Sequence, residues 1–392
     1  MRKELKDIFG ERLDLISDIL LENLYYSNIL VSHDRPSFEK PDWLDEEKFR
    51  RGQRFARDNL AGLFIGQYYG LFCLLCHREG LKTMIATQKS HTPYLAFKRY
   101  LSTGQRVRNW YTEDPWCKGT KAYEDIQTVK KMHLAVSEKL NELDYKQIES
   151  MSTIKDPYCP AFRIITDDFS TILPPDSVSA RIYEEHVNNF CIYSNSKRIN
   201  QMEMSYTIFG FIGLPVLFPR YFGIYPETDE DLENLCYVWR CIGYLLGVDD
   251  EINICRGNLK EVKVRCQSYL DDLVKPAFKI IEPQWEHMIR CIVEGNSYIT
   301  NSSSFETIVL SLADMMGIAM PSFYSSLSYR QRIAYYLTKY FIRYGLKYSF
   351  IRRFVNKFLN SLFDAALAFD HSKIAELRIK SKSSPLHVSV GK

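Results

Sequence analysis

The sequence has few of the features that mark β-rich, nucleotide-binding or hydrolytic proteins. Only 18 glycines and 15 prolines interrupt 392 residues. Strand-like alternation is rare, and no internal repeat occurs. There is no phosphate-binding loop, no Rossmann glycine fingerprint and no Ser-His-Asp pattern. Because long stretches at helical period remain, we predict an all-α fold.

An excess of charge of either sign is also missing. The chain has 51 Lys and Arg against 48 Asp and Glu, a net charge of +3, and shows no basic run typical of nucleic-acid binding. We therefore expect no nucleic-acid partner. Hydrophobic residues make up 46% of the chain, which indicates a globular protein with a large core. The charged opening MRKELKDIFGERLDL predicts no signal peptide and an intracellular location.

Cysteine is present without the spacing of a metal site or a disulfide framework. Ten cysteines occur singly, apart from Cys73 and Cys76 within the apolar run GLFCLLCH. No second pair completes a zinc site, so we expect all ten to be reduced packing residues. The acidic cluster Asp249, Asp250 and Glu251 follows a predicted helix over 229–249. We interpret it as a solvated helix end or as salt-bridge partners, with a metal site as the alternative.

Aromatic residues are abundant, with 26 Tyr and 23 Phe, which suits a large apolar ligand or an ordinary large core. Two long apolar runs stand out, at 59–76 and 201–219. The first is uncharged and approaches the length of a membrane span. Its borderline length and internal Gln67 favour a buried core helix. Polar and amphipathic helices are expected over 46–59 and 94–107, and an irregular segment over 144–178.

The stretch 119–143 predicts a helix that carries a histidine in its inward stripe. Its apolar positions recur at steps of three and four, Thr120 is a candidate N-cap, and the lysines, including Lys130, fall off the stripe. The inward stripe consists of Ala122, Ile126, Val129, His133, Val136, Leu140 and Leu143. A buried imidazole needs partners. Those of His133 are either ordinary hydrogen-bonding groups or a metal ion. His186, on a second candidate helix over 177–195, is interpreted as a surface or half-buried histidine.

The C-terminal part interleaves Arg and Lys with Tyr, Phe, Ile and Leu, in SYRQRIAYYLTKYFIRYGLKYSFIRRFVNKFLNSLF. This pattern is typical of a segment on an anionic membrane surface. A peripheral helix docked on the core, with cations that extend to solvent, gives the same pattern. We expect four regions: an N-terminal helix and loop over 1–44, a core over 45–300, C-terminal helices over 301–380, and a disordered tail over 381–392.

Several separated motifs occur in an order that resembles one protein family. They are FRRGQRF at 49–55, RYLST at 99–103, VKKMH ending at His133, QMEMSYTIFGF at 201–211 and YVWRCIGYLLGVDDEINIC at 237–255. Together they resemble the latex-clearing (rubber oxygenase) family of haem-dependent oxygenases, and the similar fungal ER-bound enzymes that cleave a farnesyl chain. The resemblance covers roughly residues 45–260.

The resemblance implies a globin-like helical core around haem b, with His133 as the proximal iron ligand. It also implies that Arg99 and Thr103 lie on the distal side, that Thr207 lies near the pocket, and that Arg240 helps to bind the cofactor. The reaction it implies uses O2 to cleave or oxygenate a C=C bond of a hydrophobic substrate, a prenyl, terpenoid or polyene lipid. Peripheral contact with a membrane, at the cytosolic face of the ER, would suit such substrates. No oligomeric state is implied.

Two departures from the family pattern limit what the resemblance implies. Rubber oxygenases carry a lysine just before the signature threonine, where this chain has Ser102, so we expect no lysine-ligated resting state. The segment LKTMIATQKSHTPYLAF before Arg99 holds no carboxylate that could serve as a base. Two alternatives therefore accompany the oxygenase: a non-catalytic haem or hydrophobic-ligand binder, and a cofactor-free helical scaffold at a membrane surface.

Overall fold

Helices make up the secondary structure of the described chain. The computed structural model describes residues 26, 29–32, 35–36, 39–173, 198–300 and 304–390. Within these ranges β-pairing is limited to two isolated bridges, Leu30 with Asn200 and Ile154 with Val390. The predicted all-α class is confirmed. The helix expected over 177–195, with His186, lies outside the described residues, and so do residues 1–25 of the N-terminal region expected over 1–44.

The helices before the gap at 174–197 are α3 (Glu46–Asp58), α4 (Leu60–Cys76), α5 (Arg78–Ala86), α6 (Pro93–Thr112), α7 (Lys121–Asn141), α8 (Tyr145–Met151) and α9 (Phe162–Phe169). Those that follow, up to the break at 301–303, are α11 (Gln201–Leu217), η3 (Pro219–Phe222), α12 (Asp229–Leu245), α13 (Leu259–Tyr269), η4 (Leu270–Val274), α14 (Lys275–Lys279) and α15 (Pro283–Ser297). The C-terminal helices are α16 (Phe305–Met315), α17 (Pro321–Ser326), α18 (Tyr329–Tyr340), η5 (Phe341–Gly345), α19 (Ser349–Leu367) and α20 (His371–Lys382).

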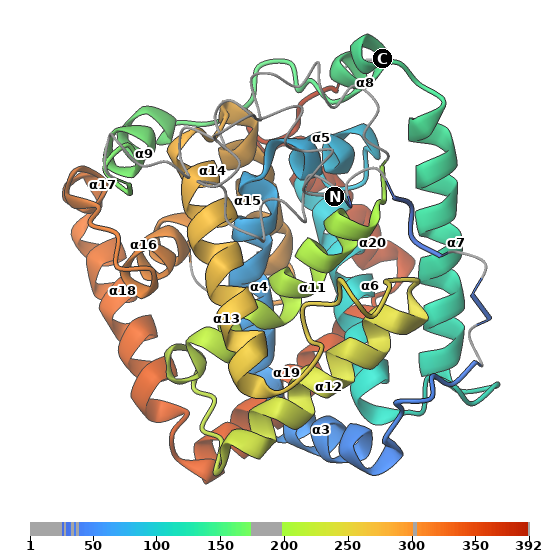
Figure 1. Ribbon diagram of the computed structural model, residues 1–392. Helices are drawn as coiled ribbons and strands as arrows, with labels where there is room; N and C mark the ends of the chain where they lie inside the picture. The colour runs from blue at the N-terminus through green and yellow to red at the C-terminus, as the bar shows by residue number, and fades with distance from the viewer. Residues whose placement is uncertain are drawn as a thin grey trace, which may run out of the picture.

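The centre of the molecule is the crossing of α4 and α11, the two apolar runs of the sequence (Figure 1). Their glycines allow the two backbones to touch, because a Cβ on Gly70 would overlap the carbonyl of Gly210. Most of α4 is buried, as predicted for a core helix. Among the described residues, no single helix has both the length and the apolarity of a membrane span. Taken together, α3 and α4 reach that length and apolarity, but the chain bends by 88° between them.

Helix α7 stands at one side of the molecule and α16 to α18 at the opposite side (Figure 1). The predicted start of α7 is confirmed, since the Thr120 side chain accepts a hydrogen bond from the N–H of Tyr123 at 3.1 Å. The expected irregular segment over 144–178 is wrong in part, because α8 and α9 form there. An Asp144–Gln147 capping box starts α8, a local signal that the proline-rich neighbourhood obscured.

The expected boundary at residue 300 does not separate two cores. A single cluster of buried side chains runs from Val31 to Leu386 and includes Phe305 and Phe323 from the C-terminal region. The expectation of a disordered tail also fails for the described part of that tail. Leu386 is buried there, and the N–H of Lys155 donates to the Ser389 carbonyl at 3.2 Å. The backbone of the tail thus pairs with the segment between α8 and α9, through Lys155 with Ser389 and Ile154 with Val390.

Candidate functional site

The antiparallel pair α6 and α7 carries three of the predicted site residues (Figure 1). Near the turn that joins them, Asn109 on α6 donates a hydrogen bond to Asp125 on α7 at 2.7 Å. Arg106 lies 3.6 Å from the same carboxylate. At about 1.5 Å per residue, His133 lies about 12 Å from that contact along α7, and Arg99 lies about 15 Å from it along α6. Both residues therefore lie toward the end of the helix pair that is away from the connecting turn.

His133 is half-buried on the inward face of α7, with its Nδ1 atom shielded from solvent. The stripe predicted around it is confirmed at Ala122, Ile126, Val129 and Leu140. Lys130 was predicted to face water, which is wrong, because it is buried and its ammonium donates to the Arg35 carbonyl. One turn beyond His133, the Ser137 hydroxyl donates to the Arg198 carbonyl at 3.0 Å. The His133 side of α7 therefore faces the segments around residues 35 and 198.

Arg99 and Thr103 lie one turn apart on α6, next to α5. The Arg99 guanidinium donates to the Thr87 hydroxyl at 3.2 Å and lies 2.9 Å from the Met84 sulfur. The Thr103 hydroxyl donates to the Arg99 carbonyl at 3.1 Å, within its own helix. On the same face of α5, the buried hydroxyl of Thr83 has no hydrogen-bond partner. A buried hydroxyl without a partner costs free energy, so this is a place where a polar ligand atom would be accepted.

Thr207 and Arg240 come from other walls of the core. The half-buried Thr207 donates to the Glu203 carbonyl at 2.7 Å, within α11. Arg240 on α12 makes a two-pronged ion pair with Asp250, at 2.7 Å and 2.6 Å, and its guanidinium stacks over Trp43 at 3.8 Å. Those contacts occupy the charged end of Arg240, so it holds the loop after α12 in place. The acidic cluster accordingly acts as salt-bridge partners, since Asp249 also pairs with Arg35 at 3.0 Å.

A buried ion network, which sequence reasoning missed, lies where α5, α8 and the start of α11 meet. Arg198 pairs with Glu79 at 2.7 Å, and the almost fully buried ammonium of Lys82 contacts Glu149. Burial opposes the charge on Lys82, but its hydrogen bond to Glu149 and the charge of Glu79 raise its pKa overall. These residues come from distant segments, so no local motif could have revealed the network.

A second missed cluster surrounds His287 on α15. Its Nδ1 accepts a hydrogen bond from the N–H of Tyr158 at 3.0 Å, so the ring proton is on Nε2, which donates to the His91 carbonyl at 3.1 Å. Cys291 Sγ lies 3.5 Å from Nε2. Both ring nitrogens are engaged, and burial lowers the pKa of His287 and raises that of Cys291. The pair is therefore unsuited to nucleophilic catalysis, which needs a thiolate beside a free base.

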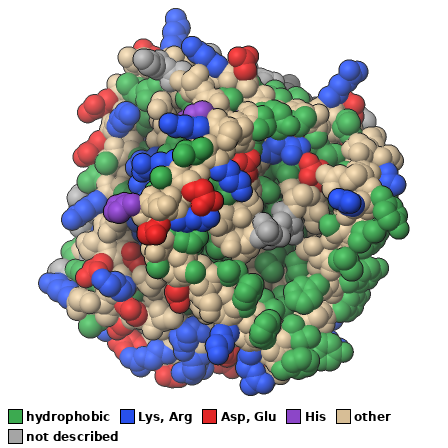
Figure 2. Space-filling view, turned by 180° about the vertical axis from the view of Figure 1, so that it is seen from behind, with side chains coloured by type: hydrophobic (Ala, Val, Ile, Leu, Met, Phe, Trp, Pro, Cys, Tyr) green, Lys and Arg blue, Asp and Glu red, His purple; other side chains and the backbone are tan. Residues whose placement is uncertain are grey.

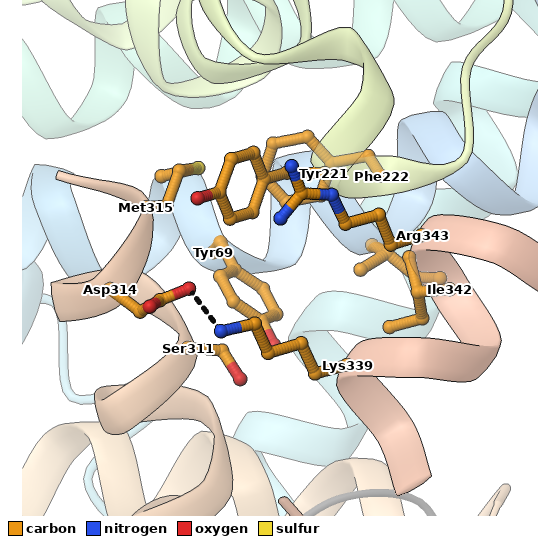
Figure 3. A pocket seen from close by; sticks show the side chains of 10 residues that line it. Tyr69, Tyr221, Phe222, Ser311, Asp314, Met315, Lys339, Ile342 and Arg343 are labelled. Atoms are coloured by element: carbon orange, nitrogen blue, oxygen red, sulfur yellow. Dashed lines mark ion pairs between the residues drawn. The ribbon is translucent and has the colours of Figure 1, made fainter. Parts of the chain in front are cut away.

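A small cavity lies away from His133, between α4, α16 and η5. Its volume is about 20 Å³, room for about one water molecule. Figure 3 shows Lys339 reaching Asp314 across it, with Arg343 over the ring of Tyr221. In the described ranges, no group of three or more His, Cys, Asp or Glu side chains could hold a metal ion. A metal at His133 would therefore have to bring its other ligands, as the iron of haem does.

Comparison with known proteins adds no family assignment. No family model matches the chain, and no curated protein or solved structure matches it either.

Proposed function

We propose that the chain is a haem b-dependent oxygenase that uses O2 to cleave or oxygenate a C=C bond of a hydrophobic unsaturated substrate, with a globin-like core. The observation that carries the proposal is that Arg99 and His133 lie on two neighbouring helices, α6 and α7, which the Asn109–Asp125 hydrogen bond joins. The ordered motifs of the sequence support the same assignment, because RYLST and VKKMH lie on these two helices.

Three features of α5, α6 and α7 support haem as the cofactor. The Nδ1 of His133 is shielded from solvent, as expected for a histidine whose other ring nitrogen would ligate iron. Arg99 supplies a fixed positive charge on α6, next to α5. The hydroxyl of Thr83, buried without a partner, can donate to a bound polar atom. Arg240 does not fit, because Asp250 and Trp43 already occupy its guanidinium.

The protein's contribution to the reaction would be electrostatic and steric. When bound, haem supplies the oxygen chemistry. Arg99 would stabilise negative charge on a bound polar group, and the Thr83 hydroxyl would donate a hydrogen bond to it. Thr103 could add a second hydroxyl only by giving up its hydrogen bond to the Arg99 carbonyl. The apolar faces of the helices exclude water and receive a prenyl, terpenoid or polyene chain.

The second candidate is a non-catalytic haem or hydrophobic-ligand binder. Two observations favour it. The hydroxyls of Thr103 and Thr207 both donate to carbonyls of their own helices. The segment 81–97 before Arg99 holds no carboxylate that could act as a base. This candidate predicts haem binding without turnover, whereas a cofactor-free scaffold predicts a colourless protein.

The test is an absorption spectrum of the full chain expressed with a haem supply, followed by a product assay. His133→Ala should remove the Soret band, whereas His371→Ala, at an exposed position on α20, should leave it unchanged. Aldehyde or ketone products from prenyl substrates would separate the oxygenase from the binder. A folded but colourless wild-type protein under haem titration would overturn both.

A further inference from the structure

The outer face of α18, η5 and α19 is apolar although it faces solvent. Tyr329 is 78% exposed, Leu337 66% and Phe354 71%. Other large hydrophobic side chains share this face, namely Ile333, Tyr336, Tyr340, Phe341, Tyr344, Tyr348, Phe350 and Phe358. We call this set the aromatic face. Figure 2 shows hydrophobic side chains gathered at the lower right, the side where Figure 1, seen from the opposite direction, draws α18 and η5.

The aromatic face is separate from the side chains that attach these helices to the core. Tyr335, Ile342 and Leu346 point inward and are buried, and Asn356 anchors α19. The outward rings instead stack on one another along the helices, Tyr336 on Tyr340 at 6.3 Å and Phe354 on Phe358 at 6.5 Å. Packing of the fold therefore does not require the outer rings. Monomeric proteins rarely expose so continuous an apolar surface unless it binds something.

Charge on these helices has a single sign. Residues 328–363 contain no Asp or Glu but eight cations, namely Arg330, Arg332, Lys339, Arg343, Lys347, Arg352, Arg353 and Lys357. The whole chain carries only +3, so the rest of it is net negative. This segment is therefore the concentrated positive part of the molecule.

The cations divide into an engaged set and a free set. Lys339 pairs with Asp314 at 2.8 Å, and Arg343 lies over the Tyr221 ring at 4.8 Å, both against the body of the protein (Figure 3). In the described structure, four exposed cations on the outer side have no such partner: Arg330, Lys347, Arg353 and Lys357. Free cations thus flank exposed aromatic rings along the same helices.

We propose that the aromatic face docks onto the surface of an anionic lipid bilayer. The Phe rings and Leu337 would enter the boundary between head groups and acyl chains. The Tyr side chains suit the level of the head groups, because each has an apolar ring and a polar hydroxyl. The four free cations would meet anionic head groups at the same depth. A second copy of this chain is a poorer occupant, because it would bring eight more cations against the same positive face. The proposal rests on these helices alone and does not depend on haem.

The test is vesicle flotation of the full-length protein at low salt. We expect binding to vesicles of phosphatidylcholine with phosphatidylserine, little binding to phosphatidylcholine alone, and release at high salt, because a Debye length shortens to about 3 Å at 1 M. Equal binding to both vesicle types would overturn the electrostatic part of the proposal. Failure to float with anionic vesicles would overturn all of it, whatever the outcome of the haem experiment.

Paired variants assign the binding to this face. Phe354→Ser with Phe358→Ser should lower the bound fraction, and Arg353→Glu with Lys357→Glu should lower it roughly tenfold or more. The control for charge is Lys131→Glu with Lys139→Glu, the same change at exposed positions on α7, and Val264→Ser on α13 is the control for apolar exposure. Equal losses in the controls would contradict the proposal. A second result would also contradict it: light scattering shows dimers that the Phe variants dissociate, and no variant changes flotation.

Discussion

Asn356 on α19 caps the first turn of the central helix α4, because its side-chain oxygen accepts a hydrogen bond from the N–H of Ala61 at 2.9 Å. Its amide nitrogen donates back across the helix break, to the Asp58 carbonyl at 2.8 Å. Asn59, which holds the N-cap position of α4, makes no side-chain capping bond. Asn356, which lies 295 positions after Ala61 in the sequence, thus stabilises the bend between α3 and α4. The C-terminal helices are therefore part of the core fold.

Replacing that cap should destabilise the whole protein. Asn356→Ala leaves the buried Ala61 N–H without its partner and removes the part-buried hydrogen bond to the Asp58 carbonyl. We expect a loss of about 1–3 kcal/mol in the free energy of unfolding. Urea unfolding followed by circular dichroism measures it. Asn360→Ala is the matched control, since Asn360 bonds only to the Asn356 carbonyl in its own helix. Similar losses of stability in both variants would show that the Asn356 side chain does not stabilise the bend between α3 and α4.

The crossing of α4 and α11 depends on a glycine contact. Gly70→Ala would place a methyl group onto the Gly210 carbonyl, so the helices must separate, and we expect a loss of about 2 kcal/mol or more in stability. Gly80→Ala on α5 meets only ordinary van der Waals contact, and we expect a gain of roughly 0.5–1 kcal/mol from helix propensity. Thermal unfolding of the two variants compares them. A neutral Gly70→Ala would refute the close crossing.

Stability should fall in mild acid because of buried histidines. Burial lowers the pKa of His287 from its ordinary value of 6.5, so between pH 6.5 and the lower folded value the unfolded state binds more protons than the folded state. The contribution of His287 is complete above pH 6.5 and is lost as the pH falls through the folded-state pKa. His287→Gln should therefore show a smaller decrease in the free energy of unfolding between pH 8 and pH 5.5 than the wild type.

Urea titrations at the two pH values measure that decrease. His91, whose pKa burial also lowers, stays in both proteins and acts in the same direction. His371→Gln, at an exposed position, is the control and should keep the wild-type pH dependence. If His287→Gln lost as much unfolding free energy between pH 8 and pH 5.5 as the wild type, His287 would not be a source of the pH dependence.

Arg240 should be a structural residue and not a cofactor ligand. Arg240→Ala removes the two-pronged pair with Asp250 and the stacking on Trp43, and we expect a loss of about 1–3 kcal/mol in stability. Arg240→Ala and Asp250→Ala should be non-additive in a double-mutant cycle, because they share one interaction. Haem content per folded chain should stay at the wild-type level. Loss of haem at unchanged stability would reinstate Arg240 as a cofactor-binding residue.

The parts of the fold that sequence predicted well were those encoded in local patterns. The stripe on α7, its Thr120 cap and the burial of most of α4 follow from spacing within one helix. The helix expected over 229–249 ends earlier, at Leu245, and Gly247 just after it has a φ of +96°. Errors arose where distant segments meet. Lys130 is buried, and its ammonium donates a hydrogen bond to the Arg35 carbonyl, a contact that helical periodicity could not show.

The candidate site was predictable only in part for the same reason. The sequence placed Arg99 and His133 on separate helices, but it did not show that α6 and α7 lie side by side. The partner of Arg240 lay in the same motif, at Asp250, but its ion pair depends on how the loop after α12 folds back. Spacing within one helix could show only the pairs Glu79–Lys82 and His287–Cys291. The contacts of Lys82 with Glu149 and of His287 with Tyr158 come from segments far away in the sequence.

The central claim is that His133 ligates haem iron. The most direct measurement is the absorption spectrum of the purified wild type, His133→Ala and His371→Ala, expressed together with a haem supply and checked for folding by circular dichroism. We predict a Soret band in the wild type and in His371→Ala, its loss in His133→Ala, and partial recovery of that variant with added imidazole. A His133→Ala protein that folds and keeps the wild-type band, or a folded wild type that stays colourless with haem, would contradict the claim.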